Sequence, residues 1–523
     1  MSKNNQNRTQ NSLRNSKWHI IYKLIMFLFP FIIRNIIIKQ LGIEYLGLSG
    51  LFTSVLSVLS LAELGFGTAI VYSLYKPVAE ENNELVCAIL NYYKKIYRTV
   101  GITILVLGLS ISPFLSHFIK GEVPSDINIY ILYYIYLFNT VVSYFLFAYR
   151  GCIFHAFQRN DIGTKITILT KLFLYLVQLL LLIIFRNYYC YVIVIPVTTI
   201  LNNLITYFFS RRYFGEYTPK GMISPELKKS IKEQVKGILV ERITSVMESS
   251  LDIIIISWLI GLRDVAMYNN YLTVMNGLIG ILAVIPESVR NSIGNSIATE
   301  SIEKNYKDFT KFNFIYMYIC SICTVCLFCL YPDFITLWIG KEYLFSAIIT
   351  ILICIHFYTL KAGDFTAGYF GANGLWQHAK AAYIAEIIIN LTLNIILGKL
   401  LGLTGIIIST ILSLGLTNIF LIPRILFKKY FQKKLRNYLF PLAYYFLATV
   451  FVTGLFYFIL NKLALPVTWI TFFIKGLLLF ICSALLLFLF FFKLPYFKDS
   501  KDFVILIVEK IFHLKTKKGN ESK

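Results

Sequence analysis

The sequence is divided into apolar runs of about 20 residues by short segments rich in charged or turn-forming residues. The run GLLLFICSALLLFLFFF at 476–492 is typical. A helix of about 20 residues crosses the hydrocarbon core and pairs its own backbone groups there. The strands of an outer-membrane barrel would instead show apolar and polar residues in alternation. We therefore predict an all-α, polytopic membrane protein with about fourteen transmembrane helices. The predicted spans are 18–38, 47–75, 96–118, 127–149, 162–185, 189–210, 237–260, 267–296, 309–331, 343–370, 379–398, 403–423, 438–461 and 466–492.

The composition supports this prediction, with 57% hydrophobic and only 15% charged residues. The net charge of +23 comes from basic residues between the runs and at the chain ends, where they meet anionic lipid headgroups. Membrane lipids are therefore expected partners, and nucleic acid is not. Four cysteines lie inside one apolar run and not in a loop, so we expect helix packing there and no metal centre. They are Cys320, Cys323, Cys326 and Cys329.

Basic residues also predict the orientation of the chain. The segments on one side hold most of the Lys and Arg, including 211–236 and 424–437, whereas each loop on the other side holds about one. Both termini are therefore predicted to be cytoplasmic. The outer loops are too short for a catalytic domain. This argues against a membrane glycosyltransferase or polysaccharide polymerase, and we expect a protein that is not an enzyme.

Two segments with the same order of features indicate an internal repeat. LGIEYLGLSGLF at 41–52 and IGLRDVAMYNNYL at 260–272 each introduce a span, and Gly42 and Gly261 are 219 residues apart. A duplication of six spans predicts two six-helix lobes related by a pseudo-two-fold axis along the membrane normal, with a cavity between them. The predicted domains are a cytoplasmic N-terminal tail (1–17), an N-lobe (18–210), a basic cytoplasmic linker (211–236), a C-lobe (237–423), a basic cytoplasmic loop (424–437), two extra transmembrane helices (438–492) and a cytoplasmic C-terminal tail (493–523).

Charged residues inside the predicted spans are the candidates for function, because charges at membrane depth face a bundle interior or a wet cavity and usually mark a transport path. Basic side chains in such a cavity suit an anionic group, and arginine can hold phosphate oxygens in a bidentate manner. The candidates for substrate binding are Arg34, Lys171, Arg242, Arg290 and Lys361. The candidates for ion coupling or a structural role are Glu63, Glu248, Asp252, Glu287, Asp364 and Glu386.

The alternative interpretation is that neighbouring opposite charges form structural ion pairs that lock the helices. Glu287 with Arg290 and Lys361 with Asp364 have the required spacing of three residues. No G-x-x-x-x-G-K-[ST] motif is present, so no nucleotide cofactor is expected. Energy would come from an ion gradient, the membrane potential or the substrate gradient.

Two stretches of the sequence resemble a known family. They are LGIEYLGLSGLFTSVLSVLSLAELGFGTAIVYSLYKPVAEEN at 41–82 and DIIIISWLIGLRDVAMYNNYLTVMNGLIGILAVIPESVRNSIGNSIATES at 252–301. Both are similar to the signatures of Wzx-type polysaccharide-repeat-unit flippases, which belong to the multidrug/oligosaccharidyl-lipid/polysaccharide exporter superfamily. Many Wzx proteins are described with twelve spans, whereas the related lipid II flippases have fourteen.

The resemblance implies a function in capsular or exopolysaccharide biosynthesis. Such flippases move undecaprenyl-diphosphate-linked oligosaccharides from the inner to the outer leaflet of the bacterial plasma membrane, by alternating access through a cationic cavity. Arg34 and Arg290 occupy spans comparable to those whose arginines serve the diphosphate in lipid II flippases. The lipid-linked oligosaccharide and the polysaccharide polymerase machinery are the implied partners. The alternatives are a cation-coupled multidrug extruder of the same fold, which would use the acidic residues, and a non-transporting scaffold.

Glu63 lies about midway along the second predicted span, within LSLAELGFGTAI. A charged carboxylate at that depth needs a partner, for which Arg34 is the first candidate and Arg290 the second. The arginine would exchange this partner for the substrate diphosphate, and the carboxylate would then take up a proton or a sodium ion. The opposing hypothesis is that Glu63 is a neutral, hydrogen-bonded packing residue.

Overall fold

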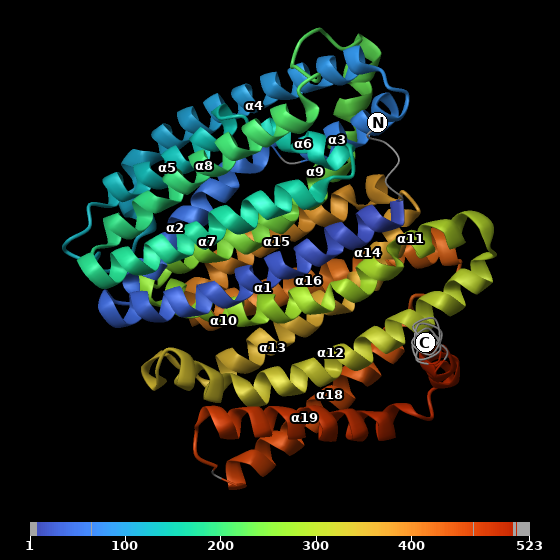
Figure 1. The fold of residues 1–523 in the computed structure, drawn as a ribbon. Helices are drawn as coiled ribbons and strands as arrows, with labels where there is room; N and C mark the ends of the chain where they lie inside the picture. Colours follow the sequence, from blue (N-terminus) through green and yellow to red (C-terminus); the bar gives the residue numbers. More distant parts are fainter. Residues whose placement is uncertain (1–7, 64, 464, 506–508, 510–523) are drawn as a thin grey trace, which may run out of the picture. The chain divides into compact units, whose positions relative to one another are not determined.

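The computed structural model describes residues 8–63, 65–463, 465–505 and 509, and its regular elements over these residues are helices (Figure 1). The first elements are α1 (Arg8–Gln40), α2 (Glu44–Leu59), η1 (Ser60–Glu63), α3 (Phe66–Ala79), α4 (Asn83–Ile111), η2 (Ser112–Phe118), α5 (Ile129–Phe145), η3 (Ala148–Arg150), α6 (Gly151–Ala156), α7 (Asn160–Phe185), α8 (Tyr188–Phe214) and α9 (Pro225–Leu259). The later elements are α10 (Leu262–Leu282), α11 (Val284–Thr299), α12 (Ile302–Trp338), η4 (Lys341–Tyr343), α13 (Ala347–Ala362), α14 (Asp364–Ala372), α15 (Trp376–Leu401), α16 (Leu403–Leu414), η5 (Gly415–Leu421), α17 (Ile422–Leu426), η6 (Phe427–Phe431), α18 (Arg436–Leu463) and α19 (Trp469–Phe491).

The helices confirm the predicted all-α polytopic fold. Within the described residues, eleven helical segments are long and apolar enough to cross a membrane, and the pair Ile129–Phe145 and Ala148–Ala156, bent by 50°, makes a twelfth. The other two predicted spans are also helical but fall short of that standard. The 47–75 span is broken into α2, η1 and α3, and the 237–260 span lies in α9, whose charged residues lower its hydropathy.

The described chain forms two compact units. The first contains the described residues up to Asn270 together with Asn394–Ile406, and the second contains Tyr271–Leu393 and the described residues from Ile407 onward. In the first unit, α7 packs along α1 and α8, while α2 packs against α9. In the second unit, α12 packs against α13, α18 and α19.

The two glycines that suggested a repeat have the same local structure. Gly42 and Gly261 both have positive φ, +128° and +145°. Gly42 lies in the short turn between α1 and α2, and Gly261 lies in the short turn between α9 and α10. The carbonyl of Ile37 accepts the Gly42 N–H at 3.1 Å, and the carbonyl of Ile256 accepts the Gly261 N–H at 3.0 Å. Glycine suits both positions because a left-handed residue satisfies the last carbonyls of the helix without a Cβ penalty.

These two segments also contact each other within the first unit. A Cβ added to Gly47 of α2 would lie 2.2 Å from the Leu262 carbonyl oxygen, and one added to Gly50 would lie 2.4 Å from the Asn269 amide. The Leu262 carbonyl is backbone and cannot yield as the Asn269 side chain can, so glycine is required at position 47 for this close approach of α2 to α10. The packing holds the start of α10, and with it Asn270, beside the first helices.

Candidate functional site

Glu63 lies at a break in the second predicted span. The helix tightens into the 3₁₀ turn η1, Gly65 follows with φ of +90°, and the chain then restarts as α3. The Glu63 carboxylate accepts a hydrogen bond of 2.6 Å from the Tyr144 hydroxyl of α5. The predicted ion pair with Arg34 is not formed in this conformation, because Glu63 accepts from Tyr144 while Arg34 donates to Asn270. The second predicted partner, Arg290, is an exposed residue of the other unit.

Arg34 is half-buried on α1 and is held by a neutral group. Its Nη1 donates to Oδ1 of Asn270 at 2.5 Å. Tyr188 and Tyr191 of α8 lie close to the guanidinium. Because Asn270 is neutral, an anion could bind the remaining guanidinium N–H groups without first displacing a carboxylate.

A polar pocket of about 380 Å³ lies in the first unit between α1, α6, α7 and α8. Among the described residues no Lys, Arg, Asp or Glu lines it, and most of its lining groups are amides, hydroxyls or imidazoles. Its lining residues are His19, Tyr22, Ala148, Gly151, Phe154, His155, Asn160, Gly163, Thr164, Thr167, Asn202, Asn203 and Thr206. Such groups donate and accept hydrogen bonds as sugar hydroxyls require, and Tyr22 and Phe154 add apolar faces.

Asn160 gives this polar pocket an open acceptor. Its Oδ1 is buried and has no hydrogen-bond partner among the described residues. A buried acceptor without a partner costs free energy, so a ligand donor that reached it would recover that cost. Asn202, in contrast, already accepts from Thr170 at 3.1 Å.

Lys171 extends the polar face of α7 beyond this pocket. Asn160, Thr164, Thr167 and Lys171 follow each other at intervals of three or four residues, which places them along one helix face. Lys171 is half-buried and has no acceptor or ion-pair partner among the described residues. A cation within a membrane span therefore lies one turn from a neutral polar pocket.

The acidic candidates of α9 also lie within the first unit. Asp252 is 3% exposed and accepts from the Asn394 amide at 2.7 Å, and Glu248 precedes it by one helical turn. Glu386 is buried on α15 in the second unit. There the neighbouring Asn390 donates to Thr410 and Ser413.

Ion pairs with a buried lysine occur in the described part of the second unit. Lys361 donates to the Asp364 carboxylate at 2.7 Å, and the Tyr316 hydroxyl donates to the same carboxylate oxygen. Lys475 of α19 donates to Asp333 of α12, also at 2.7 Å. The first pair agrees with the structural alternative weighed for Lys361 and Asp364, because each charge is already satisfied.

The remaining candidates lie on exposed surfaces of their units. Arg242 of α9 and both Glu287 and Arg290 of α11 are exposed. Among the described residues, no ion pair joins Glu287 to Arg290. The predicted substrate residues are thus divided, with Arg34, Lys171 and Arg242 in the first unit and Arg290 and Lys361 in the second.

The sequence reasoning missed three buried polar features. Arg150, 3% exposed, donates to Ser210 at 3.1 Å and lies over the Tyr207 ring. Asp333 was missed because it lies just past the predicted end of its span, and nothing in the sequence links it to Lys475. Asp161 is fully buried in an ion cluster, for which its spacing of four residues from Lys165 was a usable signal. Its partners in that cluster are Arg14, Arg159 and Lys165.

Comparison with solved structures defines the class of fold. The structure of the lipid II flippase MurJ in an inward closed conformation is 14% identical and superposes with a TM-score of 0.64, covering 90% of this chain and 97% of that chain. An inward-facing multidrug resistance MATE transporter of the MOP superfamily is 16% identical, with a TM-score of 0.57 and coverage of 76% and 95%. A MOP superfamily transporter from Pyrococcus furiosus, with a binding pocket described as reversed in polarity, is 15% identical, with a TM-score of 0.53 and coverage of 78% and 93%. The chain therefore has the fold shared by these transporters.

The family follows from the sequence itself. Residues 12–289, more than half of the chain, match the family described as polysaccharide biosynthesis protein. The chain belongs to this family. No curated protein sequence matches it.

Proposed function

We propose that this protein is a flippase that carries undecaprenyl-diphosphate-linked oligosaccharide repeat units across the bacterial plasma membrane for capsular or exopolysaccharide biosynthesis. Membership of a polysaccharide biosynthesis family and a fold shared with a lipid II flippase support the proposal. Alternating access of two six-helix lobes, with both termini cytoplasmic, would move the substrate between leaflets. The polysaccharide polymerase machinery is the proposed recipient of the product.

The observation that carries the proposal is the neutral polar pocket with Lys171 one turn away. A lipid-linked oligosaccharide has uncharged hydroxyl-rich sugars next to a diphosphate, and it needs those two kinds of site side by side. The pocket volume of about 380 Å³ suits part of an oligosaccharide. Lys171, which has no partner among the described residues, supplies the positive charge.

Arg34 and Glu63 complete the proposed cycle. Arg34 is held by Asn270, so binding of a phosphate would exchange a neutral acceptor for a charged one and strengthen the hydrogen bond. Glu63, held by Tyr144, would bind the coupling ion, a proton or a sodium ion. Arg242 and Arg290 remain proposed substrate contacts, whereas Lys361 is proposed to be the structural partner of Asp364. Glu248, Asp252, Glu287 and Glu386 remain proposed coupling or structural residues.

The test is complementation of a deletion strain. Deleting the gene should accumulate the lipid-linked oligosaccharide on the cytoplasmic leaflet, and the wild-type gene should restore export. Lys171→Gln should fail to restore export while Lys171→Arg restores it in part, because the charge is what the diphosphate requires. Lys341→Gln, which removes one exposed positive charge elsewhere, is the matched control. Normal export by the deletion strain, with no redundant flippase, would refute the proposal.

A multidrug extruder coupled to a cation is the second candidate. Its support is the MATE transporter fold and the acidic groups Glu63 and Asp252 within the first unit. The cationic Lys171 and Arg34 in the same unit would repel a cationic drug. A resistance phenotype that depends on Asp252, in a strain whose polysaccharide export is unaffected by the deletion, would favour this candidate.

A further inference from the structure

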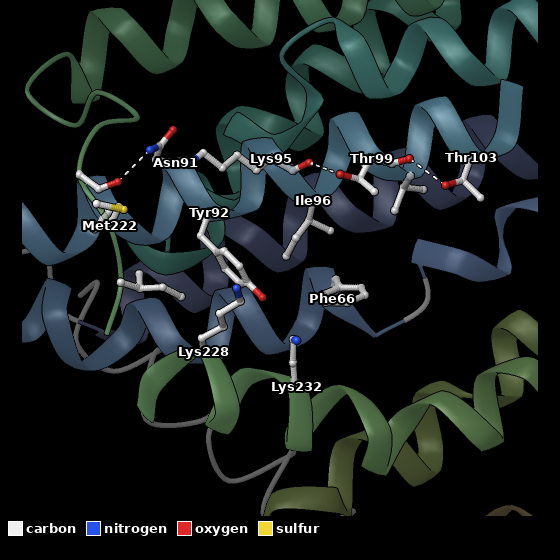
Figure 2. A pocket seen from close by; sticks show the side chains of 14 residues that line it. Phe66, Asn91, Tyr92, Lys95, Ile96, Thr99, Thr103, Met222, Lys228 and Lys232 are labelled. Atoms are coloured by element: carbon white, nitrogen blue, oxygen red, sulfur yellow. Dashed lines mark hydrogen bonds between the residues drawn. The ribbon is translucent and has the colours of Figure 1, made fainter. Parts of the chain in front are cut away.

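A second cavity of the first unit has the opposite character to the polar pocket. It is a groove of about 570 Å³ between α3, α4, the start of α9 and the segment before α9 (Figure 2). We name it the basic groove, and it is lined by Phe66, Ala88, Asn91, Tyr92, Lys95, Ile96, Thr99, Val100, Thr103, Gly221, Met222, Ile223, Lys228 and Lys232. None of the residues proposed for substrate transport is among them.

The described lining of the basic groove contains three lysines and no acidic residue. Lys95 belongs to α4, and Lys228 and Lys232 lie one turn apart on α9. Figure 2 shows Lys228 and Lys232 reaching from α9 toward Tyr92 and Phe66. The Lys228 ammonium lies 5.9 Å from the centroid of the Tyr92 ring. Three like charges around one hollow repel each other, so an anion bound among them is stabilised.

Specific contacts build one wall of this groove. The Asn91 side chain donates to the Gly221 carbonyl at 2.8 Å, which ties the segment before α9 to α4. Gly221 has φ of +82°, a conformation that a residue with a Cβ rarely adopts. Ser224 then caps α9 by accepting from the Leu227 N–H at 3.2 Å. The segment that carries Met222 is therefore fixed over the groove by its own turn chemistry.

Apolar residues of α4 also line the groove, and exposed apolar residues follow them along the same helix. Ile96 and Val100 line it on α4, and Met222 beside it is 88% exposed. Further along the same helix, Ile102 and Val106 are more than half exposed. We call these apolar residues of α4 the apolar track. Lysines next to an apolar track suit a ligand with an anionic head and a hydrocarbon tail, whereas a free anion would contact only the lysines.

We propose that the basic groove binds the phosphate ester of an anionic membrane lipid, with the phosphate among Lys95, Lys228 and Lys232 and an acyl chain along α4. This site is separate from the proposed transport path and does not depend on the proposed function. On the predicted topology it takes a lipid of the cytoplasmic leaflet. The ligand would join α4 to the start of α9 and so stabilise the α9 helix.

The experiment is native mass spectrometry of the purified full chain in neutral detergent, titrated with phosphatidylglycerol or with zwitterionic phosphatidylcholine. The wild type should retain phosphatidylglycerol in preference. Each lysine-to-glutamine change in the groove should weaken retention about tenfold, which is the effect of losing one charge-assisted hydrogen bond. The triple variant Lys95→Gln, Lys228→Gln, Lys232→Gln should lose the preference entirely.

Two control variants distinguish binding in the groove from a general effect of the positive charge of the protein. Lys428→Gln, Lys429→Gln, Lys434→Gln removes the same charge from exposed positions on another basic segment and should leave retention unchanged. Thr103→Trp keeps every charge, fills the groove from an exposed position and should also weaken retention. An equal loss in the 428/429/434 variant, or full retention in the groove triple variant, would overturn the proposal.

Competition with glycerol 3-phosphate distinguishes the two sources of a phosphate ester. If millimolar glycerol 3-phosphate fails to displace the lipid, the apolar track contributes and a lipid is the ligand. If it displaces the lipid from the wild type, the lysines recognise the phosphate alone and the soluble ester is a ligand of the same site. A wild type that binds neither would refute the site.

Discussion

Buried charges are satisfied differently in the two units of this protein. In the second unit Lys361 pairs with Asp364 and Lys475 pairs with Asp333, both at 2.7 Å. In the first unit Arg34 and Glu63 are held by a neutral amide and a neutral hydroxyl, and Lys171 has no partner in the described part of the chain. The ion cluster around Asp161, at the start of α7, is an exception in the first unit.

This difference separates structural charges from available ones. A buried ion pair is costly to break, because removing one partner leaves the other charge without compensation. A charge that is held by a neutral group can exchange that group for a substrate or an ion at lower cost. We therefore expect the two ion-pair variants below to lose the most stability, and the Glu63 and Arg34 variants to lose transport with little loss of stability.

Asp364→Asn should cause the largest loss of stability. It leaves the Lys361 ammonium, 6% exposed, without its counter-charge and weakens the acceptor of the Tyr316 hydroxyl. The expected loss is about 3–5 kcal/mol in the free energy of unfolding, measured by denaturation in mixed micelles. The double variant Lys361→Met, Asp364→Leu should recover most of this stability and still transport. Loss of transport in a stable double variant would instead assign Lys361 to substrate binding.

Asp333→Asn should follow, with a loss of about 3 kcal/mol. Lys475 is left without its partner, but its side chain is 10% exposed and can reach the membrane interface more readily. Because this pair joins α12 to α19, the variant should also expose α19 to proteolysis. Lys475→Met combined with Asp333→Leu is the control. If Asp333→Asn has normal stability, the Lys475 pair does not hold α19 in place.

The apolar runs were sufficient to predict the helices, and every predicted span is helical in the described residues. The break at Glu63 was not predicted, although Gly65 and Gly67 follow it in the sequence, because the continuous apolar character of 47–75 outweighed that signal. Without the break the orientation of Glu63 could not be derived. Its partner Tyr144 is 81 residues away, and helical spacing fixes only neighbours within one helix.

The polar pocket illustrates the same limit for the site. Its described lining includes no Lys, Arg, Asp or Glu, so the charged residues within spans do not point to it. Only the fold brings Tyr22 of α1, Asn160 of α7 and Asn202 of α8 around one cavity. Lys171 and Arg34 were predicted, because a single charge in an apolar run is visible in the sequence alone.

Glu63→Gln should cost only about 1 kcal/mol, because the glutamine carbonyl can still accept from Tyr144. Transport should nevertheless fall strongly, since an amide cannot take up a proton or a sodium ion. Tyr144→Phe is the complementary control, because it removes this hydrogen bond, which Glu63→Gln retains, but keeps the carboxylate. Accumulation of lipid-linked oligosaccharide is measured at equal protein abundance. Wild-type export by Glu63→Gln would eliminate the coupling role and leave Glu63 as a packing residue.

Arg34→Lys should have the smallest effect on stability, below about 1 kcal/mol, because an ammonium can still donate to Asn270. Export should fall about tenfold, since lysine cannot reproduce the bidentate contact of a guanidinium with phosphate. Asn270→Ala tests whether the neutral partner of Arg34 is needed for export. It frees the guanidinium from a neutral partner and should preserve export. If Arg34→Lys instead destabilised the protein as much as Asp364→Asn, Arg34 would be a structural charge, and the contrast between the two units would fail at one of the residues proposed to hold the phosphate.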